Sequence, residues 1–343
     1  MSKIGKYIYG VINSNVVNSS ETSDCAYSVS FQDIAAVVKD SETVDCSRMS
    51  RDMLARLLVS HQQLIEKVMT RHTIIPMRLG TFAQSDEEVK EILASGYRTI
   101  KDIFGRAKDM VEIDVAATLS DFNSFMQEIS EEVEIKQLKQ SLLSKKGGVT
   151  IDDQMEVGVL VKKHLDKRRT DYAGRIQAAL SVVCDSFKPH DLMDDKMVLN
   201  TAFLLNQNKQ NDFERKVEEI NNEFKEKFNF RCVGPLPPYS FYTLEIKKAQ
   251  FEEIDWAKKT LGLKNDFITA VELKKAHRRS ALTCHPDKNQ DTPDIEQKFS
   301  EMTRAYKILL DYYRACNQSE HDDGCCLNEK AFEKNAVLVT TMA

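Results

Sequence analysis

A helical period of apolar and polar positions is clearest between residues 51 and 72. Apolar side chains recur there at intervals of three and four residues: Met53, Leu54, Leu57, Leu58, Leu64, Ile65, Val68 and Met69. This spacing places them on one stripe of an α-helix, with His61 in a gap of that stripe. The segment therefore predicts an amphipathic helix that buries one face.

Shorter apolar runs on both sides of this helix predict strands, because they are rich in β-branched and aromatic residues. They span residues 7–12, 29–31, 35–38, 73–82 and 110–116. Pro76 favours a bulge or an edge position for the fourth run. Ser85 and Glu88 form a capping box that opens a helix running to about Lys108. We expect an α+β domain at residues 1–118, in which strands pack against two helices.

The rest of the chain predicts further units. Residues 119–190 are charged and poor in proline, which favours two helices broken at Gly147 and Gly148. Residues 191–250 predict a second α+β unit, with strands at 198–205, 228–233 and 241–246 and a helix face formed by Phe213, Val217, Ile220 and Phe224. Residues 251–316 are mainly helical, and residues 317–343 form a polar tail with a short candidate strand near the end.

Composition narrows the class of protein. Of 343 residues, 42% are hydrophobic and 29% are charged, as expected for a folded globular chain. The 48 basic residues are outnumbered by 53 acidic ones, so bulk charge gives no reason to expect nucleic-acid binding. No apolar stretch approaches the roughly 20 residues of a membrane span, and the N-terminus lacks the pattern of a signal peptide. We expect a cytoplasmic protein that binds neither membrane nor nucleic acid.

Candidate chemistry for catalysis or metal binding is sparse. Eight cysteines occur without a Cys-x-x-Cys spacing, and His321 beside Cys316, Cys325 and Cys326 is the nearest approach to a metal site. Adjacent cysteines chelate one ion poorly, so we expect no metal. No glycine-rich phosphate loop or nucleophile elbow is present. The acid pairs at 152–153 and 194–195 are typical of helix starts and loops. We therefore expect no enzyme activity and no cofactor.

Three separated segments carry a family resemblance. They are YIYGV at residues 7–11, HQQLIEKVMTRHTIIPMRLGTF at residues 61–82 and VGPLPPYSF at residues 233–241. In this order they resemble the gas vesicle accessory proteins of the GvpL/GvpF family, over about residues 1–250. The resemblance implies an α+β fold of two ferredoxin-like α+β units with intervening helices, no enzyme activity, and a role in assembling gas vesicles, the hollow shells that give aquatic microbes buoyancy.

The run at residues 73–82 is a candidate contact surface for such a helper, because shell subunits with a large apolar face need protection before they assemble. An edge position at Pro76 exposes backbone groups to a partner strand. The candidate contact residues are Pro76, Met77, Arg78 and Leu79. The alternative is that this apolar run is core, and that Arg78 is a solvated charge or part of an internal ion pair.

A second resemblance lies near the C-terminus. Residues 273–289 read LKKAHRRSALTCHPDKN and residues 297–309 read QKFSEMTRAYKIL. This pattern resembles the J domain of DnaJ-type co-chaperones, a small all-helical domain that we place at residues 251–316. The His-Pro-Asp motif lies between a basic helix and a second helix with an inward stripe formed by Phe299, Met302, Tyr306 and Leu309. We expect Trp256 and Leu261 on the preceding helix to fill core positions.

The J-domain resemblance implies a docking surface for a DnaK-type chaperone. Its members would be Lys274, Lys275, Arg278 and Arg279 on the basic helix and His285, Pro286 and Asp287 in the loop. The positive face would orient the encounter, and the loop would couple docking to ATP hydrolysis by the partner. The chain departs from the family at His277, Ser280, Thr283 and Cys284, which puts full activity in doubt more than the fold.

Together the two resemblances imply one function. We expect a gas vesicle assembly accessory protein, in the cytoplasm and on gas vesicles, that binds gas vesicle shell or accessory proteins. Its J domain would recruit a DnaK-type chaperone and stimulate the ATPase of that partner. Two alternatives remain open: a chaperone adaptor with unrelated clients, and a scaffold whose J domain no longer couples to the chaperone.

Overall fold

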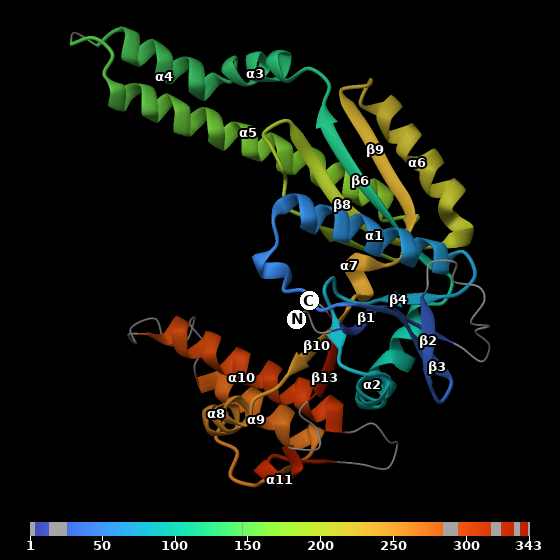
Figure 1. The fold of residues 1–343 in the computed structure, drawn as a ribbon. Coiled ribbons are helices and arrows are strands. Elements are labelled where there is room, and N and C mark those ends of the chain that lie inside the picture. Colours follow the sequence, from blue (N-terminus) through green and yellow to red (C-terminus); the bar gives the residue numbers. More distant parts are fainter. Residues whose placement is uncertain are drawn as a thin grey trace. The chain divides into compact units, whose positions relative to one another are not determined.

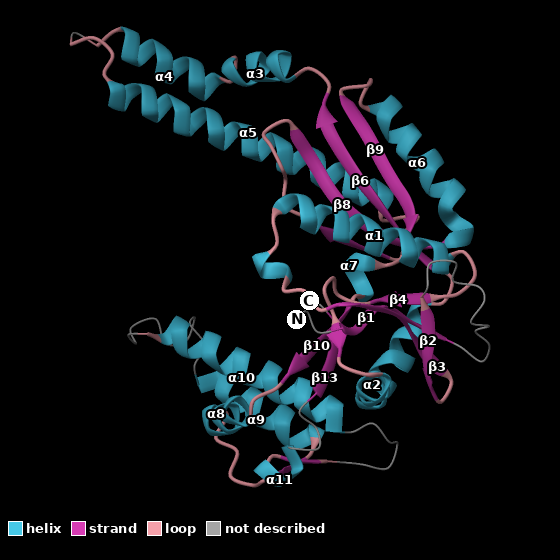
Figure 2. Ribbon diagram, viewed as in Figure 1, coloured by secondary structure: helices cyan, strands magenta, loops and turns pink. Residues whose placement is uncertain are grey.

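The computed structural model describes residues 4–13, 26–145, 147–283, 294–316, 324–332 and 337–341 of the chain (Figures 1 and 2). The chain divides into two compact units. The first combines Met1–Lys108 with Phe241–Ala343, and the second is Asp109–Ser240. Among the described residues, no helix is long and apolar enough to cross a membrane.

The first unit contains an antiparallel sheet with strand order β2-β3-β1-β4, in which β5 also pairs with β1. Its strands are β1 (Ile4–Asn13), β2 (Tyr27–Phe31), β3 (Ile34–Glu42), β4 (Ile74–Pro76) and β5 (Phe82–Ala83). These strands lie at the predicted apolar runs. Because β4 pairs with β1 at one end of this order, the predicted edge position of Pro76 is correct.

Helices α1 (Arg51–Met69) and α2 (Asp86–Ala107) pack on opposite faces of this sheet. The core on one face joins Ile8, Val11 and Val38 to Leu93 and Ile100 of α2 and to their apolar neighbours. Tyr7 and Tyr9 point to the other face, where their rings contact His61 of α1. Helix α2 begins as predicted, since the side chain of Ser85 accepts a hydrogen bond from the backbone N–H of Glu88.

Only the C-terminal half of α1 meets the prediction of a buried stripe. His61, Leu64, Ile65 and Val68 are buried. In the N-terminal half, however, Met53 is 56% exposed and Leu58 is 41% exposed. The apolar stripe therefore continues beyond the part of the helix that the sheet covers. Amphipathic spacing defines a face of a helix but not the length over which that face is covered.

The second unit is built on the sheet β7-β8-β6-β9, in which all neighbours are antiparallel. Its strands are β6 (Met110–Leu119), β7 (Ser186–Pro189), β8 (Met197–Asn206) and β9 (Phe228–Leu236). Its helices are α3 (Phe122–Ser130), α4 (Val133–Leu143), α5 (Ile151–Leu180) and α6 (Gln210–Glu223). Within this unit, α4 and the first half of α5 form a long antiparallel pair that extends past the sheet (Figure 1).

The domain boundaries expected from sequence differ from this arrangement. Residues 110–116 were expected in the domain 1–118, yet β6 pairs with β8 and β9 of the second unit. Residues 241–246 were expected to complete the unit 191–250, but β10 (Leu244–Lys248) pairs with β13 (Val337–Thr341) in the first unit. The helical segment 119–190 belongs to the second unit, where α5 packs on β8, rather than standing as a separate middle domain. Periodicity identifies a strand but carries no information about its partners.

The helical segment contains α3, α4 and α5 where two helices were expected. The predicted break is present, because Gly148 has a positive φ of 74° between α4 and α5. The additional break lies at Glu132, whose φ of −58° and ψ of 137° end the helical path between α3 and α4. No glycine or proline marks this second break in the sequence.

The C-terminal part of the first unit is a small helical domain. It contains α8 (Phe251–Thr260), α9 (Ala270–Thr283) and α10 (Ile295–Cys316), with β11 (Phe267–Ile268), β12 (Cys325–Cys326) and α11 (Glu329–Phe332) beside them. Its core is formed mainly by Ile254, Ala257, Leu261, Leu273, Ala276, Met302, Ala305, Leu309 and Tyr312. The predicted inward positions Met302 and Leu309 are buried, and Phe299, Tyr306 and Trp256 pack partly buried against the same core.

Candidate functional site

Helix α9 presents a basic face to solvent. The helix begins with a reciprocal cap, because the backbone N–H of Glu272 donates to Oγ1 of Thr269 and Oε2 of Glu272 accepts from the backbone N–H of Thr269. Leu273 and Ala276 are buried toward α10, which fixes the rotation of α9. The same rotation directs the side chains of Lys274, Lys275, Arg278 and Arg279 outward, and all four residues are exposed.

This basic face is uncompensated on the described part of the protein. No acidic side chain there forms an ion pair with Lys274, Lys275 or Arg278. Arg279 reaches toward the end of α8, with Nη2 at 3.5 Å from the carbonyl oxygen of Leu261. Lys275 and Arg279 also border a groove of about 410 Å³ along α9. Concentrated positive charge without a partner favours association with an acidic protein surface.

The departures from the J-domain pattern have specific surroundings. His277 stacks on Tyr306 of α10, with ring centroids 4.0 Å apart and an interplanar angle of 22°. Oγ1 of Thr283 donates to the carbonyl oxygen of Arg279 at 2.9 Å. Ser280 is half-buried. The ring of His277 thus packs between α9 and α10. Cys284, His285, Pro286 and Asp287 lie outside the described residues.

The family segments of the first unit meet in one hydrogen-bond network. Nε2 of His61 lies 3.1 Å from the carbonyl oxygen of Met77, and Nδ1 lies 2.9 Å from the hydroxyl of Tyr7. Because a carbonyl only accepts, Nε2 carries the proton and Nδ1 accepts from Tyr7. The same hydroxyl accepts from the backbone N–H of Gly80 at 3.3 Å. Burial lowers the pKa of His61 to about 4, so the imidazole is neutral near pH 7.

The four candidate contact residues divide into two groups. Pro76 and Met77 are buried, and Met77 is only 2% exposed. Arg78 is exposed and pairs with Glu245 of β10, while Leu79 is half-buried. The carbonyl oxygen of Leu244 accepts from the backbone N–H of Arg78 at 2.8 Å. The interpretation of Pro76 and Met77 as core, and of Arg78 as part of an internal ion pair, therefore describes this segment better than an open strand edge.

The third family segment closes the second unit. The backbone N–H and the hydroxyl of Ser240 both donate to the carboxylate of Glu112 on β6, each at 2.8 Å. Glu112 is 1% exposed, and burial raises its pKa to about 7. Gly234 lies in β9, and a Cβ there would lie 2.8 Å from the carbonyl oxygen of Glu112, so this position admits only glycine without a shift. The segment thus anchors the end of β9 to β6.

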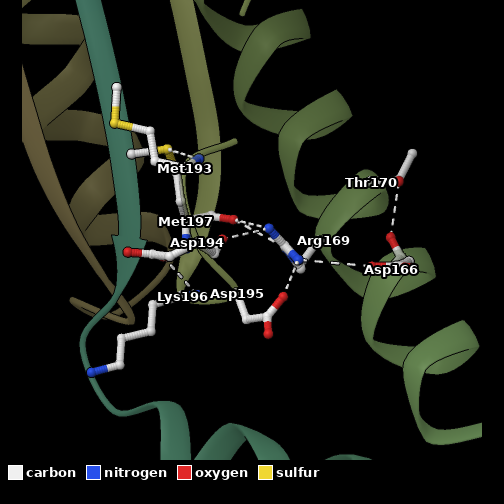
Figure 3. Close-up of polar contacts among 8 residues, drawn as sticks. All are labelled: Asp166, Arg169, Thr170, Met193, Asp194, Asp195, Lys196 and Met197. Atoms are coloured by element: carbon white, nitrogen blue, oxygen red, sulfur yellow. Dashed lines mark hydrogen bonds and ion pairs between the residues drawn. The ribbon is translucent and has the colours of Figure 1, made fainter. Parts of the chain in front are cut away.

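The acid pairs serve the backbone, as the sequence predicts. Asp153 accepts from the backbone N–H of Thr150 at the start of α5, and this bond lowers its pKa to about 2. Oδ1 of Asp194 accepts from the backbone N–H groups of Lys196 and Met197 (Figure 3). Asp195 lies 3.4 Å from the guanidinium of Arg169. Asp153, Asp194 and Asp195 thus contact backbone N–H groups or an arginine of the same unit.

Arg169 organises the loop before β8. It lies on α5 and is 7% exposed, and Figure 3 shows its guanidinium directed into this loop. Nη2 donates to the carbonyl oxygens of Met197 at 2.8 Å and Asp194 at 2.9 Å. Nε donates to Met197 as well, at 3.0 Å. Sequence reasoning missed this residue, because a single arginine within a charged helix gives no signal of burial.

The described residues contain no group of three or more His, Cys, Asp or Glu side chains placed to hold a metal ion. Cys325 is buried beside Cys316, and a hydrogen bond with that thiol raises the pKa of Cys325. His321 lies outside the described residues.

Comparison with protein families separates the chain into two parts. Residues 5–243 match the family described as gas vesicle synthesis protein GvpL/GvpF. Residues 247–315 match the DnaJ domain. The boundary between the two matches falls at β10.

Individual relatives follow the same division. The chain is 25% identical over 258 residues to gas vesicle protein F2 of Halobacterium salinarum, covering 74% of this chain and 99% of that one. It is 23% identical over 192 residues to gas vesicle protein F of Microcystis aeruginosa, covering 55% and 78%. Over 51 residues it is 52% identical to the chaperone protein DnaJ of Salinibacter ruber, covering 15% of this chain and 13% of that one.

Solved structures show the same fold. The crystal structure of gas vesicle protein GvpF from Anabaena sp. superposes with a TM-score of 0.60 at 22% identity, covering 71% of this chain and 99% of that chain. GvpF from Microcystis aeruginosa gives a TM-score of 0.57 at 19% identity, covering 70% and 99%. At these identities the likeness shows the mixed α+β fold.

Proposed function

Because the chain belongs to the GvpL/GvpF family of gas vesicle synthesis proteins and carries a C-terminal DnaJ domain, we propose that it is a gas vesicle assembly factor. In this function it binds gas vesicle shell or accessory proteins and recruits a DnaK-type chaperone to them. Its place of action is the cytoplasm and the growing gas vesicle. The observation that carries the proposal is the presence of both family matches in one chain. Neither family is enzymatic, so ATP hydrolysis belongs to the partner.

The exposed basic face of α9 supports the chaperone half of the proposal. Lys274, Lys275 and Arg278 carry charge that the described residues do not neutralise. His285, Pro286 and Asp287 follow in the sequence, as in J domains. The basic side chains attract and orient an acidic partner, and the motif couples docking to hydrolysis.

The exposed half of α1 supports the client half of the proposal. Met53, Leu58 and Val59 are 56%, 41% and 51% exposed. Met53 and Leu58 continue the stripe that is buried further along the helix. Exposed apolar side chains that extend a buried stripe are candidates for an interaction site. We therefore extend the candidate client surface from Arg78 and Leu79 to this half of α1, and assign it to the apolar face of a gas vesicle subunit.

Ferredoxin-like architecture, which the family resemblance implies, fits the second unit best. The order β6, helices α3 to α5, β7, β8, α6 and β9 is a β-α-β-β-α-β succession. In the first unit, β1, β2 and β3 precede α1, so that succession is different. We propose the ferredoxin-like description for Asp109–Ser240 alone.

Single-turnover ATP hydrolysis by a DnaK-type chaperone tests the chaperone half. The intact protein is expected to accelerate hydrolysis, and both Asp287→Asn and the double variant Lys275→Glu, Arg278→Glu are expected to lose most of that acceleration. Lys163→Glu, an exposed charge change on α5, is the matched control and should act like the intact protein. Absence of acceleration with a matched, active chaperone would leave a scaffold that no longer couples to it.

Co-expression with gas vesicle shell and accessory proteins tests the client half. Affinity capture of the intact protein should recover at least one of them. Met53→Asp combined with Leu58→Asp should abolish recovery, whereas Gln63→Asp, an exposed change on the same helix, should not. Failure of the intact protein to recover any gas vesicle protein would favour an adaptor with unrelated clients.

A further inference from the structure

Two paired strands, one before and one after the DnaJ domain in the sequence, form a two-stranded ribbon. Strand β13 pairs antiparallel with β10, from Leu244 opposite Thr341 to Lys248 opposite Val337. In the sequence, β10 immediately precedes α8 and β13 follows α11. The chain therefore enters the DnaJ domain from one strand of this pair and leaves it toward the other, as Figure 1 shows. The DnaJ match ends at residue 315, so β13 lies outside both family matches.

Neighbouring side chains of β13 enter two different cores. Leu338 is 5% exposed and belongs to the core of the helical domain, together with Ile254 and Tyr312. Val339 is also 5% exposed, but it belongs to the core between the first sheet and α2. Successive residues of a strand point to opposite sides. One short strand thus joins the hydrophobic cores on its two sides.

Helix α2 accommodates β13 at a glycine. A Cβ at Gly96 would lie 2.7 Å from Cβ of Val339 and 2.8 and 2.9 Å from its two γ carbons. These distances are shorter than a non-bonded carbon–carbon contact, so any other residue at position 96 would push β13 away from α2. A glycine inside a helix costs about 1 kcal/mol relative to alanine. The close packing of Val339 against α2 explains why a glycine is present at this position of the helix despite that cost.

We propose that β13 holds the DnaJ domain in one orientation relative to the first sheet and α2. An isolated two-stranded ribbon is marginally stable, so the ribbon depends on the two cores that it joins. The chaperone-docking helix α9 is then presented at a fixed position relative to α1 and α2, instead of on a flexible tether. A fixed orientation goes beyond recruitment of a chaperone, because it also determines where the bound chaperone lies relative to the first sheet and its helices.

Trp256 provides a direct test, since it is the only tryptophan of the chain and lies on α8 of the DnaJ domain. Its ring is partly buried and faces the guanidinium of Arg304 at 5.4 Å. Time-resolved fluorescence anisotropy of the full chain therefore reports rotation of the whole domain. The variants are a chain without residues 337–343 and Gly96→Ala. Gly105→Ala is the matched control, because a Cβ at this position of α2 meets nothing within 4 Å.

In the intact protein and in Gly105→Ala, Trp256 is expected to rotate together with the first sheet and α2, without a separate fast rotation of the DnaJ domain. Truncation and Gly96→Ala should each add a rotational component that is several-fold faster. A fast component already present in the intact protein would overturn the proposal, and so would slow rotation in the truncated chain. Should Gly96→Ala lower the helical circular dichroism signal, the truncated chain, checked in the same way, decides the question.

Discussion

The hydroxyl of Tyr7 lies 2.9 Å from Nδ1 of His61, which joins the first strand to the first long helix across 54 positions of sequence. Both residues belong to the segments that carry the GvpL/GvpF resemblance. Through Met77 and Gly80 the same network fixes the loop after β4. These family residues therefore support the structure of the first unit and are not available for contact with a partner.

Stability should depend on pH through His61. Its pKa is about 4 in the folded protein and close to 6.5 in an unfolded chain. Between these values the unfolded chain binds a proton that the folded chain does not, so the contribution of His61 to stability falls as the pH decreases from about 6.5 to 4. At about 1.4 kcal/mol per pKa unit, this loss is about 3 kcal/mol, and the raised pKa of Glu112 acts in the opposite direction between about pH 7 and 4.5. Urea unfolding at a series of pH values measures it.

His61→Gln removes the His61 titration but not that of Glu112, so between about pH 6.5 and 4 the variant should lose less stability on acidification than the intact protein, by about 3 kcal/mol. His72→Gln, in the turn after the same helix, is the control and should retain the slope of the intact protein. An unchanged slope in His61→Gln would mean that another group dominates the acid range.

Replacement of Arg169 should destabilise the second unit. Arg169→Met leaves the carbonyl oxygens of Met197 and Asp194 without their buried donor. Loss of a buried charged partner costs about 3 kcal/mol or more. The urea concentration at the midpoint of unfolding should therefore fall, with unfolding of the second unit monitored by hydrogen exchange of the β8 amides.

Arg175→Met is the matched control on the same helix. Arg175 is 57% exposed and pairs with an exposed Glu223, an interaction expected to contribute less than about 1 kcal/mol. Equal effects of the two substitutions would contradict the role assigned to Arg169.

The stacking of His277 on Tyr306 predicts which substitutions the DnaJ domain tolerates. His277→Tyr should preserve stability, because a larger ring can keep the contact between α9 and α10. His277→Ala should cost about 1 kcal/mol through loss of the aromatic pair and its buried area. Thermal unfolding monitored by Trp256 fluorescence distinguishes them. If alanine were tolerated as well as tyrosine, the stacked pair would make no net contribution.

Substitution of glycine by alanine should have opposite effects on stability at Gly234 and Gly174. Gly234→Ala places a Cβ 2.8 Å from the carbonyl oxygen of Glu112 and should destabilise the protein by about 1–3 kcal/mol. Gly174→Ala, inside α5 with nothing within 4 Å, should stabilise it by about 0.5–1 kcal/mol. Melting temperatures of the two variants should therefore move in opposite directions. A shift in the same direction would show that β9 relaxes around Gly234.

The positions of the helices and strands are more predictable from the sequence than the pairing and packing of these elements. Apolar periods locate β1, β3, β6 and β8, and the capping signal at Ser85 locates the start of α2. The pairing of β6 with β8 and β9 depends on residues that are far apart in sequence, so no local pattern predicts it. For the same reason, the stripe of α1 predicts a helix face but not that Met53 remains exposed.

The candidate site shows the same division. The basic residues of α9 form a compact signal in the sequence, and the burial of Leu273 and Ala276 directs them outward. The sequence predicts a short strand near the end of the chain, but it gives no sign that Val339 of that strand packs against Gly96, because this contact depends on tertiary structure. Sequence motifs therefore predict what the DnaJ domain contains, whereas its attachment depends on tertiary packing.

The ribbon of β10 and β13 gives the protein a modular architecture. Residues 249–336 depart and return between the paired positions Lys248 and Val337, so the two ends of this insertion are neighbours. Insertions with adjacent ends are the ones that a host domain accepts without rearrangement. The DnaJ domain is therefore an insertion between two paired strands, and Leu338 is a side chain of β13 that packs into the core of the inserted domain.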